Sequence, residues 1–369
     1  MRILFSSAGG HGHLLPLMPL ARAFRQAGHD VAVLTAESTR HLVESEDVEL
    51  FVAVPSEMDV IEEIRRRTGV DLLAGVTFEG ELDYFAGTRL DMAADDAIEV
   101  ARTWKPDLVV CDIADFLAPL VAAAVGAPWA MLAYGTRRPD EKTSQLNERA
   151  ATHYGPRGLV PAPPLAYLDT CPPTLNYPGW APPVERLFVR PEAHRAESDV
   201  VVPPKGTRPR IVVTFGTVFG SASTLSPLLR ALDPLDAEIV ATLSGAQATD
   251  FDADVRERVT FVSFVPLDDL LRDVDVIVTH GGAGTTLAAL ARGVPLVIVP
   301  QGADQPRQAE RVSAVGAGVT TDVAGVPDTV RRCLEDPAIR ASAARLADEI
   351  AAMPTPADVV ETLVQRVSD

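Results

Sequence analysis

Short apolar runs alternate with helix-like stretches in two separate parts of the chain, and this alternation constrains the fold more than any other feature. The runs of the first part are RILFSS, HDVAVLTA, PDLVVCD and PWAMLAY. The runs of the second part are RIVVTFG, AEIVATLSG, VTFVSFV, VDVIVTHGG and VPLVIVP. Strands that are apolar on both faces and alternate with helices form parallel sheets with helices on each side. The sequence therefore predicts an α/β protein with two Rossmann-like, doubly wound domains.

The length of the chain and a break in the alternation set the predicted domain boundaries. With 369 residues, the chain exceeds what one hydrophobic core usually holds. We expect an N-terminal domain over residues 1–200 and a C-terminal domain over 201–353. Residues 354–369 are expected to form a helix that packs back on the N-terminal domain. Residues 135–200 lose the alternation and are rich in proline, so we expect loop and linker there.

Charge, cysteines and hydropathy disfavour several classes of protein. The formal net charge of −18 argues against nucleic acid and anionic membranes as partners. Cys111, Cys171 and Cys333 form no CxxC pair, so we expect a reducing cytosol and no structural zinc. The sequence has no signal peptide and no apolar run near the roughly 20 residues of a membrane span, so we expect a soluble, cytoplasmic protein. The oligomeric state stays open, and a homodimer is one alternative.

The stretch HGGAGTT (280–286) lies between a predicted strand and a predicted helix of the second domain. Ligands of open α/β sheets bind beyond the carboxyl ends of the strands. There the glycines would let a ligand approach the backbone, and the first N–H groups of the helix are donors at its positive end. Thr285 and Thr286 add hydroxyl donors, so the turn fits a diphosphate, with His280 beside it. The alternative is that the glycines serve packing alone and that His280 is a core residue.

Polar residues follow two other strands of this domain. Gly216 and Thr217 end the run RIVVTFGT, and Gln301, Asp304 and Gln305 follow the run VPLVIVP. Amide and carboxylate groups suit the hydroxyls of a sugar. They equally suit the start of a helix that has proline in its first turn, and this alternative stays open.

The turn SSAGGHGHLLPL places His11 and His13 between the first strand and its helix. A histidine has a pKa near neutrality and can accept a proton from a substrate. Asp112 ends the strand PDLVVCD, so its carboxylate could bond the far nitrogen of such a histidine, fix the tautomer and stabilise the imidazolium. We expect His13 to be the base and His11 to be a loop residue that packs on the glycines. For Asp112, a helix cap remains the alternative.

Two stretches resemble a known family: GHGHLLPLMPLARAFRQAGH near the N-terminus and THGGAGTTLAALARGVPLVIVPQGADQPRQAERV in the second half. Both are similar to nucleotide-sugar-dependent glycosyltransferases of the GT-B fold, in the actinobacterial branch that glycosylates natural products such as antibiotics. YLDTCPPTL is similar to a segment of the same branch, and the resemblance spans nearly the whole chain. It implies two Rossmann-like domains that face each other across a cleft.

The resemblance also implies roles for individual residues. His13 matches the general base of the family, and Asp112 matches the aspartate that pairs with it. Together with the polar pattern described above, the resemblance predicts a donor site made of Gly216, Thr217, Phe264, Val265, His280, Gly282, Gly284, Thr285, Thr286, Gln301, Asp304 and Gln305.

Two departures from the family pattern bear on the nucleotide. Ala288 stands where members that use UDP-sugars usually have a glutamate bonded to both ribose hydroxyls. The tryptophan-x-proline-glutamine that reads the base is replaced by Phe264, Val265, Pro266 and Leu267. A ring is kept, and the leucine could pack on a thymine methyl. Because a 2′-deoxyribose has one hydroxyl fewer, both changes favour a dTDP-sugar.

The predicted activity is inverting transfer of a sugar, expected to be a deoxysugar, from dTDP to a small hydrophobic aglycone. No metal and no cofactor beyond the dTDP-sugar donor are expected. The predicted acceptor-binding residues are Met58, Phe78, Phe85 and Tyr134, although each would equally suit the core.

Two other classes of function stay open. One is a dinucleotide-dependent oxidoreductase, although GGAGTT matches the GxGxxG fingerprint poorly. The other is a catalytically silent relative that activates a partner transferase, although His13 and Asp112 are both present.

Overall fold

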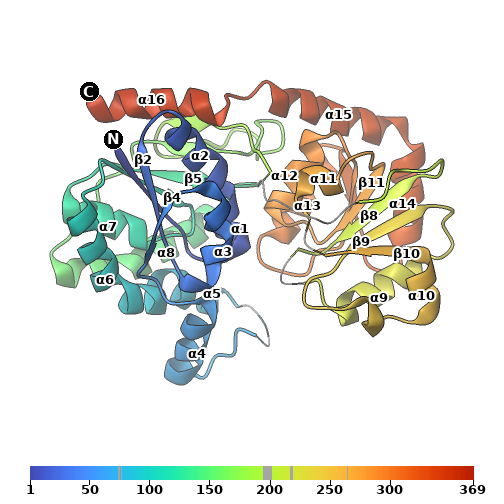
Figure 1. Ribbon diagram of the computed structural model, residues 1–369, viewed down its shortest axis with the longest axis horizontal. Coiled ribbons are helices and arrows are strands. Elements are labelled where there is room, and N and C mark those ends of the chain that lie inside the picture. Colours follow the sequence, from blue (N-terminus) through green and yellow to red (C-terminus); the bar gives the residue numbers. More distant parts are fainter. Residues whose placement is uncertain (74, 76, 194–201, 217–218, 264) are drawn as a thin grey trace. The chain divides into compact units, whose positions relative to one another are not determined.

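The computed structural model describes the chain except for residues 74, 76, 194–201, 217, 218 and 264 (Figure 1). The chain divides into two compact units. Unit 1 contains Met1–Thr170, Trp180–Arg190 and Pro354–Asp369, and unit 2 contains Cys171–Gly179 and Pro191–Met353. The boundary predicted at residue 200 lies outside the described residues. The C-terminal helix α16 (Pro356–Ser368) belongs to unit 1.

Unit 1 contains a seven-stranded sheet in the order β3-β2-β1-β4-β5-β6-β7, in which every pairing is parallel. Its strands are β1 (Arg2–Ser6), β2 (Asp30–Thr35), β3 (Glu49–Val52), β4 (Leu108–Asp112), β5 (Trp129–Ala133), β6 (Tyr167–Asp169) and β7 (Arg186–Phe188). Besides α16, its helical segments include α1 (Gly10–Leu14), α2 (Met18–Gln26), α4 (Glu57–Thr68), α5 (Phe78–Asp83), the π-helical turn η4 (Tyr84–Thr88), α6 (Arg89–Trp104), α7 (Leu117–Val125) and α8 (Asp140–Tyr154).

Helices cover both faces of this sheet, which explains why its central strands are apolar throughout. Consecutive strand residues point to opposite faces. Phe5 and Val110 pack with α2 and α16 on one face, whereas Leu4 and Val109 pack with α6 and α7 on the other. The fold predicted from the apolar runs is therefore confirmed for this unit.

The prediction of loop and linker over residues 135–200 is wrong in part, because α8, β6 and β7 lie there. Only Leu146 and Ala150 of α8 are buried, so the helix has little apolar periodicity. The strands β6 and β7 span three residues each, which is too short for a strand pattern to appear.

Unit 2 contains a six-stranded sheet in the order β10-β9-β8-β11-β12-β13, again with parallel pairings. Its strands are β8 (Arg210–Thr214), β9 (Glu238–Thr242), β10 (Val259–Val262), β11 (Val276–Thr279), β12 (Leu296–Ile298) and β13 (Gly318–Thr320). Its α-helices include α9 (Ala222–Ala231), α10 (Ala253–Arg258), α11 (Leu267–Leu270), α12 (Ala283–Ala291), α13 (Gln305–Ala314), α14 (Val326–Glu335) and α15 (Pro337–Ala351). In the described part of the chain, no helix combines the length and the apolar character needed to span a membrane.

The two sheets share one topological feature that positions the predicted sites. The strand order reverses between β1 and β4 in unit 1, and between β8 and β11 in unit 2. In open α/β sheets, ligands bind beyond the carboxyl ends of the strands at such a reversal. The turn with His13 follows β1, and the turn with His280 follows β11. Each turn therefore lies at the switch point of its own sheet.

Candidate functional site

His13 and Asp112 meet at the switch point of unit 1. His13 lies in α1, after β1, and Asp112 is the last residue of the neighbouring strand β4. Nδ1 of His13 is 3.0 Å from Oδ1 of Asp112. The side chain of His13 is 25% exposed, whereas that of Asp112 is fully buried. No residue that the structure describes hydrogen-bonds to Nε2 of His13, so this nitrogen is left for a ligand.

Hydrogen bonds hold Asp112 in its carboxylate form. The backbone N–H groups of Ala8 and Ala114 donate to its two oxygens, each over 2.8 Å. Burial raises the pKa of Asp112, but the charge of His13 and these hydrogen bonds outweigh burial and hold the pKa below its usual value. Burial lowers the pKa of His13, but the charge of Asp112 and the hydrogen bond to it hold that pKa above its usual value. The pair therefore makes His13 a better proton acceptor than a free histidine.

A buried ion pair lies beneath this turn. Nη1 of Arg89 donates to Oδ1 of Asp115 over 2.9 Å, and both side chains are buried. Nη2 of Arg89 donates to the carbonyl of Ser7 over 2.7 Å, and the hydroxyl of Ser6 donates to Asp115. Ser6 ends β1 and Ser7 begins the turn that follows. The ion pair therefore holds the backbone that leads into the turn.

Two of the four predicted acceptor residues lie next to His13. The ring centroids of Phe85 and Tyr134 are 5.3 Å and 5.8 Å from that of His13. Phe85 also packs against the buried cluster between α6 and α8. Met58 lies on α4 and is 48% exposed, and Phe78 on α5 lies under the ammonium group of a lysine. Of the four predicted acceptor residues, Phe85 and Tyr134 are therefore the two whose rings lie beside His13.

Glu57 is a second carboxylate near His13. It is the first residue of α4, and a Cβ added at Gly10 would collide with its carboxylate, so the glycine permits a close approach. Its charge raises the pKa of His13, after the larger effects of burial and of Asp112, whereas the charge of Arg138 lowers it. Sequence reasoning missed Glu57 because it lies 44 residues after His13 on another element.

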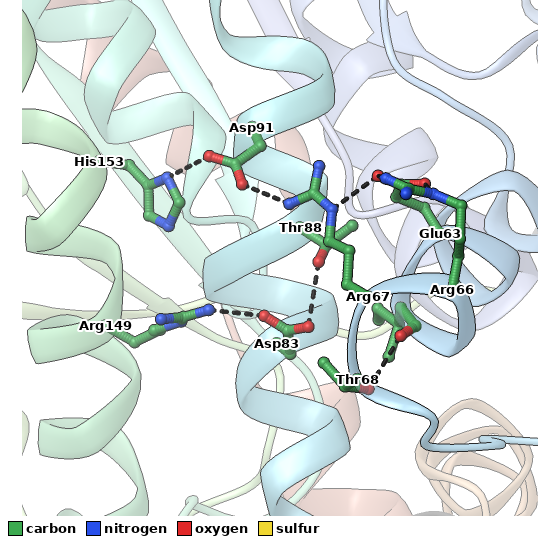
Figure 2. A network of polar contacts seen from close by, with 10 residues as sticks. Glu63, Arg66, Arg67, Thr68, Asp83, Thr88, Asp91, Arg149 and His153 are labelled. Carbon is green, nitrogen blue, oxygen red and sulfur yellow. Dashed lines mark hydrogen bonds and ion pairs between the residues drawn. The ribbon is translucent and has the colours of Figure 1, made fainter.

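A polar network connects α4 and η4 to the scaffold of unit 1 (Figure 2). Asp91 of α6 binds Arg67 of α4 at 2.6 Å and His153 of α8 at 2.9 Å. Asp83 of α5 accepts hydrogen bonds from two further residues, Arg149 of α8 at 2.7 Å and Thr88 of η4 at 3.0 Å. Exposed ion pairs add little to stability one by one. Together, the contacts of Asp91 and of Asp83 link the segments that bear Met58 and Phe85 to α6 and α8.

At the switch point of unit 2, the ring of His280 packs closely against two phenylalanine rings and against the backbone of nearby glycines. The ring of His280 lies against Phe215 and Phe219, with centroid distances of 5.8 Å and 5.7 Å. A Cβ added at Gly216 would lie 3.1 Å from Cε1 of His280, and Gly216 has a φ of 64°. A larger residue at position 216 would therefore crowd the ring of His280, which is one reason why glycine stands there. Gly284 differs, because a Cβ there would meet no described residue within 4 Å, which leaves room for a ligand.

His280 is a neutral imidazole at neutral pH. It is 8% exposed, and burial lowers its pKa to about 4. The charge of Asp304 and a hydrogen bond to the backbone of Thr214 act in the opposite direction but are weaker. Toward an anion, His280 would therefore act as a hydrogen-bond donor without a positive charge.

No side chain in the described ranges caps the N-terminus of α12, so its first N–H groups are left for solvent or a ligand. Thr285 and Thr286 are both buried. Among the described residues, none bonds to the hydroxyl of Thr286. Gly284, which directly precedes Thr285, is exposed. The geometry suits an anion at the first turn of the helix.

The predicted sugar-binding residues lie at the start of α13. Oε1 of Gln305 accepts hydrogen bonds from the N–H groups of Gln301 and Gly302, over 2.7 Å and 3.0 Å. Nε2 of Gln301 donates to the carbonyl of Val299 over 3.0 Å. Asp304 is the N-cap residue, and it accepts from a glutamine side chain one turn later. These contacts organise the loop. Among the described residues, none hydrogen-bonds to the amide NH₂ of Gln305 or to the second oxygen of Asp304.

The remaining residues discussed in the sequence analysis lie at several places in the chain. Thr217 and Phe264 lie outside the described residues. Val265 is buried just before α11, and Ala288 is half-buried on α12. His11 lies beside His41, with 5.7 Å between ring centroids. Within the described ranges, no cluster of three or more His, Cys, Asp or Glu side chains could hold a metal ion.

Comparison with known proteins identifies the same family in both halves of the chain. The family described as erythromycin biosynthesis protein CIII-like matches with its N-terminal domain over residues 22–182 and with its C-terminal domain over residues 226–366.

Individual relatives match over nearly their whole length. The 3-alpha-mycarosylerythronolide B desosaminyl transferase of Saccharopolyspora erythraea is 32% identical, over 98% of this chain and 97% of its own. The L-demethylnoviosyl transferase of Streptomyces niveus is 33% identical over the same shares. The structure of glycosyltransferase SsfS6 from Streptomyces sp. SF2575, complexed with thymidine diphosphate, is 30% identical. It superposes with a TM-score of 0.83 over 99% of both chains.

Proposed function

Because the chain belongs to the erythromycin biosynthesis protein CIII-like family and is a glycosyltransferase of the GT-B fold, we propose that it transfers a deoxysugar from dTDP to a small hydrophobic aglycone with inversion at the anomeric carbon. The names of its relatives support this substrate class, since they specify desosaminyl and demethylnoviosyl transfer. The thymidine diphosphate bound to SsfS6 supports the nucleotide. Ala288 supports it too, because it offers no group to a ribose 2′-hydroxyl.

The observation that carries the proposal is the hydrogen bond between His13 and Asp112 at the switch point of unit 1. Nδ1 faces an ionised carboxylate, so this nitrogen bears the proton and Nε2 has the lone pair. A base in this state accepts a proton from the acceptor hydroxyl. Asp112 then stabilises the imidazolium, as the carboxylate does in hydrolytic triads.

The reaction balances without a covalent enzyme intermediate. Nε2 of His13 takes the hydroxyl proton while the acceptor oxygen forms a bond to the anomeric carbon. The bond from that carbon to the diphosphate oxygen breaks, and its electron pair leaves with dTDP. Attack from the face opposite the leaving group inverts the configuration. The N–H groups at the start of α12 and the neutral His280 would stabilise the charge that develops on the diphosphate.

Calorimetry on the purified chain tests the donor half of the proposal. We expect dTDP to bind more tightly than UDP and NADH not to bind. Equal affinity for UDP would remove the argument from Ala288 but keep the family assignment. Binding of NADH alone would overturn the proposal.

Two variants test the base. In His13→Ala and Asp112→Asn, we expect transfer from a dTDP-deoxysugar to a panel of polyketide aglycones to fall about 10²- to 10⁴-fold, the usual contribution of a general base. The affinity for dTDP should stay unchanged, because neither residue lies in unit 2. Asp95→Asn, on the surface of α6, is the matched control for loss of one carboxylate. Normal transfer by His13→Ala would remove His13 from the mechanism. Detectable turnover by the unmodified chain alone would rule out a silent relative.

A further inference from the structure

The hydroxyl of Tyr134 lies at the same nitrogen of His13 that Asp112 contacts. Its Oη is 2.6 Å from Nδ1, and Oδ1 of Asp112 is 3.0 Å from that atom. We propose that Tyr134 is a positioning residue of the base, whose hydroxyl oxygen accepts the Nδ1–H of His13 alongside Asp112. The inference rests on the proposed function, in which His13 is the base. It gives this hydroxyl a role other than contact with the acceptor.

The sheet dictates the place of Tyr134. The residue follows β5 directly, and β5 lies beside β4, with Leu132 in register with Asp112. Residues two apart on a strand point to the same face. Tyr134, two positions after Leu132, therefore points its side chain along that face at the carboxyl edge of the sheet. Its ring packs against the core of unit 1 and meets the His13 ring edge-on, at an interplanar angle of 82°. The hydroxyl is thus held by a packed ring on a regular element.

The direction of the hydrogen bonds follows from Asp112. Its two oxygens accept N–H groups from Ala8 and Ala114, which stabilises the ionised form. A lone pair on Nδ1 facing this carboxylate at 3.0 Å would be repelled, so Nδ1 bears a hydrogen. One hydrogen can be shared between two acceptors in a three-centre bond. The hydroxyl oxygen of Tyr134 then accepts this hydrogen together with Asp112.

The two acceptors have different consequences for the base. Asp112 supplies negative charge, whereas Tyr134 supplies a second oxygen that disfavours rotation of the ring about the Cβ–Cγ bond. Both favour the tautomer with the lone pair on Nε2, and both stabilise the imidazolium. If Tyr134 instead donated its hydrogen to Nδ1, the proton of the neutral ring would lie on Nε2. His13 could then not accept a proton from a substrate.

The test is Tyr134→Phe in the full chain, which removes the hydroxyl and keeps the ring. Histidine ¹⁵N NMR measures the tautomer and pKa of His13, assigned by the loss of its signals in His13→Gln. We expect the His13 pKa to fall, because an acceptor of the imidazolium is lost. The charges of Asp112, Glu57 and Arg138 also act on this pKa, and all three remain in the variant. The acid limb of the pH–rate profile should move to lower pH.

The kinetic expectation is a roughly two- to tenfold lower kcat, the range for loss of one neutral hydrogen bond, with an unchanged KM for the dTDP-sugar. Tyr154→Phe is the matched control, because it also removes a tyrosine hydroxyl, which donates to the carbonyl of Phe116. If the Tyr134 hydroxyl served stability alone, both variants would be less stable and the His13 pKa would be unchanged in both.

Each outcome is decisive. An unchanged His13 titration in Tyr134→Phe would overturn the proposal, and a raised pKa would show that Tyr134 donates to Nδ1. If the titration shifts as expected but His13→Ala still transfers sugar, the proposed function fails while the contact stands. If His13→Ala is inactive and the titration is unmoved, the positioning role fails alone.

Discussion

A Cβ atom added at Gly282 would lie 2.6 Å from Nε2 of His280, closer than real Cβ atoms approach a neighbour. The backbone of Gly282 has a φ of −61° and a ψ of 141°, which any residue adopts. The glycine is therefore required by the histidine ring and not by the backbone. A glycine before a helix can thus leave room for a neighbouring side chain as well as for a ligand.

Alanine at two glycines of this turn is predicted to change stability in opposite directions and to weaken dTDP binding in both cases. Gly282→Ala should displace the His280 ring, lower the melting temperature and weaken dTDP binding about tenfold or more. Gly284→Ala meets nothing within 4 Å and lies inside α12, so the unfolding free energy should rise by up to about 1 kcal/mol. Its dTDP affinity should nevertheless fall, because the methyl group occupies the space of the diphosphate. Calorimetry and thermal unfolding measure both. Unchanged dTDP binding by Gly284→Ala would show that the diphosphate does not approach this turn.

The neutral state of His280 predicts how dTDP binding depends on pH. With a pKa of about 4, His280 has no proton to lose between pH 7 and 8.5, so the dTDP affinity should stay level there. A histidine that bound as imidazolium would lose its proton over this range, and binding would weaken. His280→Gln keeps a neutral donor and should retain part of the affinity that His280→Ala loses. An affinity that declines with pH in the native chain but not in His280→Ala would contradict this account.

The carboxylate of Glu57 predicts a shift of the pH–rate profile. His13 accepts a proton only in its neutral form, so kcat/KM should fall as the pH drops through its raised pKa. Glu57→Gln removes a charge that raises this pKa. The acid limb should therefore move to lower pH, while the rate at high pH changes little. Glu62→Gln, an exposed glutamate on the same helix, is the control. Coincident acid limbs for Glu57→Gln and the native chain would mean that Glu57 does not act on the base.

The buried ion pair predicts a stability effect confined to unit 1. Arg89→Met leaves Asp115 buried without its partner and should lower the unfolding free energy by about 3–5 kcal/mol. Arg89→Met combined with Asp115→Asn should recover part of this loss, because no unpaired charge remains. Urea unfolding followed by tryptophan fluorescence is a suitable measurement, since Trp104, Trp129 and Trp180 all lie in unit 1. A double variant less stable than Arg89→Met would refute the charge argument.

Much of the fold could be predicted from the sequence because its signals are local. Apolar runs such as those of β1, β4 and β11 are confirmed as strands of parallel sheets. Where the local signal was weak, the prediction failed: α8 buries two residues only, and β6 and β7 are held by pairing rather than by pattern. Such short strands form because a neighbouring strand offers backbone partners, and a sequence window contains no trace of that neighbour.

The sequence by itself determined that histidines follow two strand ends, because the carboxyl edge of a parallel sheet is where a chain leaves a strand for a helix. Only the tertiary structure decided which residues meet there. The order of strands brings Asp112 to His13 across 99 residues, and it brings Tyr134 to the same nitrogen across 121. The pairing of Arg89 with Asp115 has the same origin. Hydrogen bonds and buried charges act over a few ångströms in space, and the distance between residues along the chain does not specify their distance in the fold.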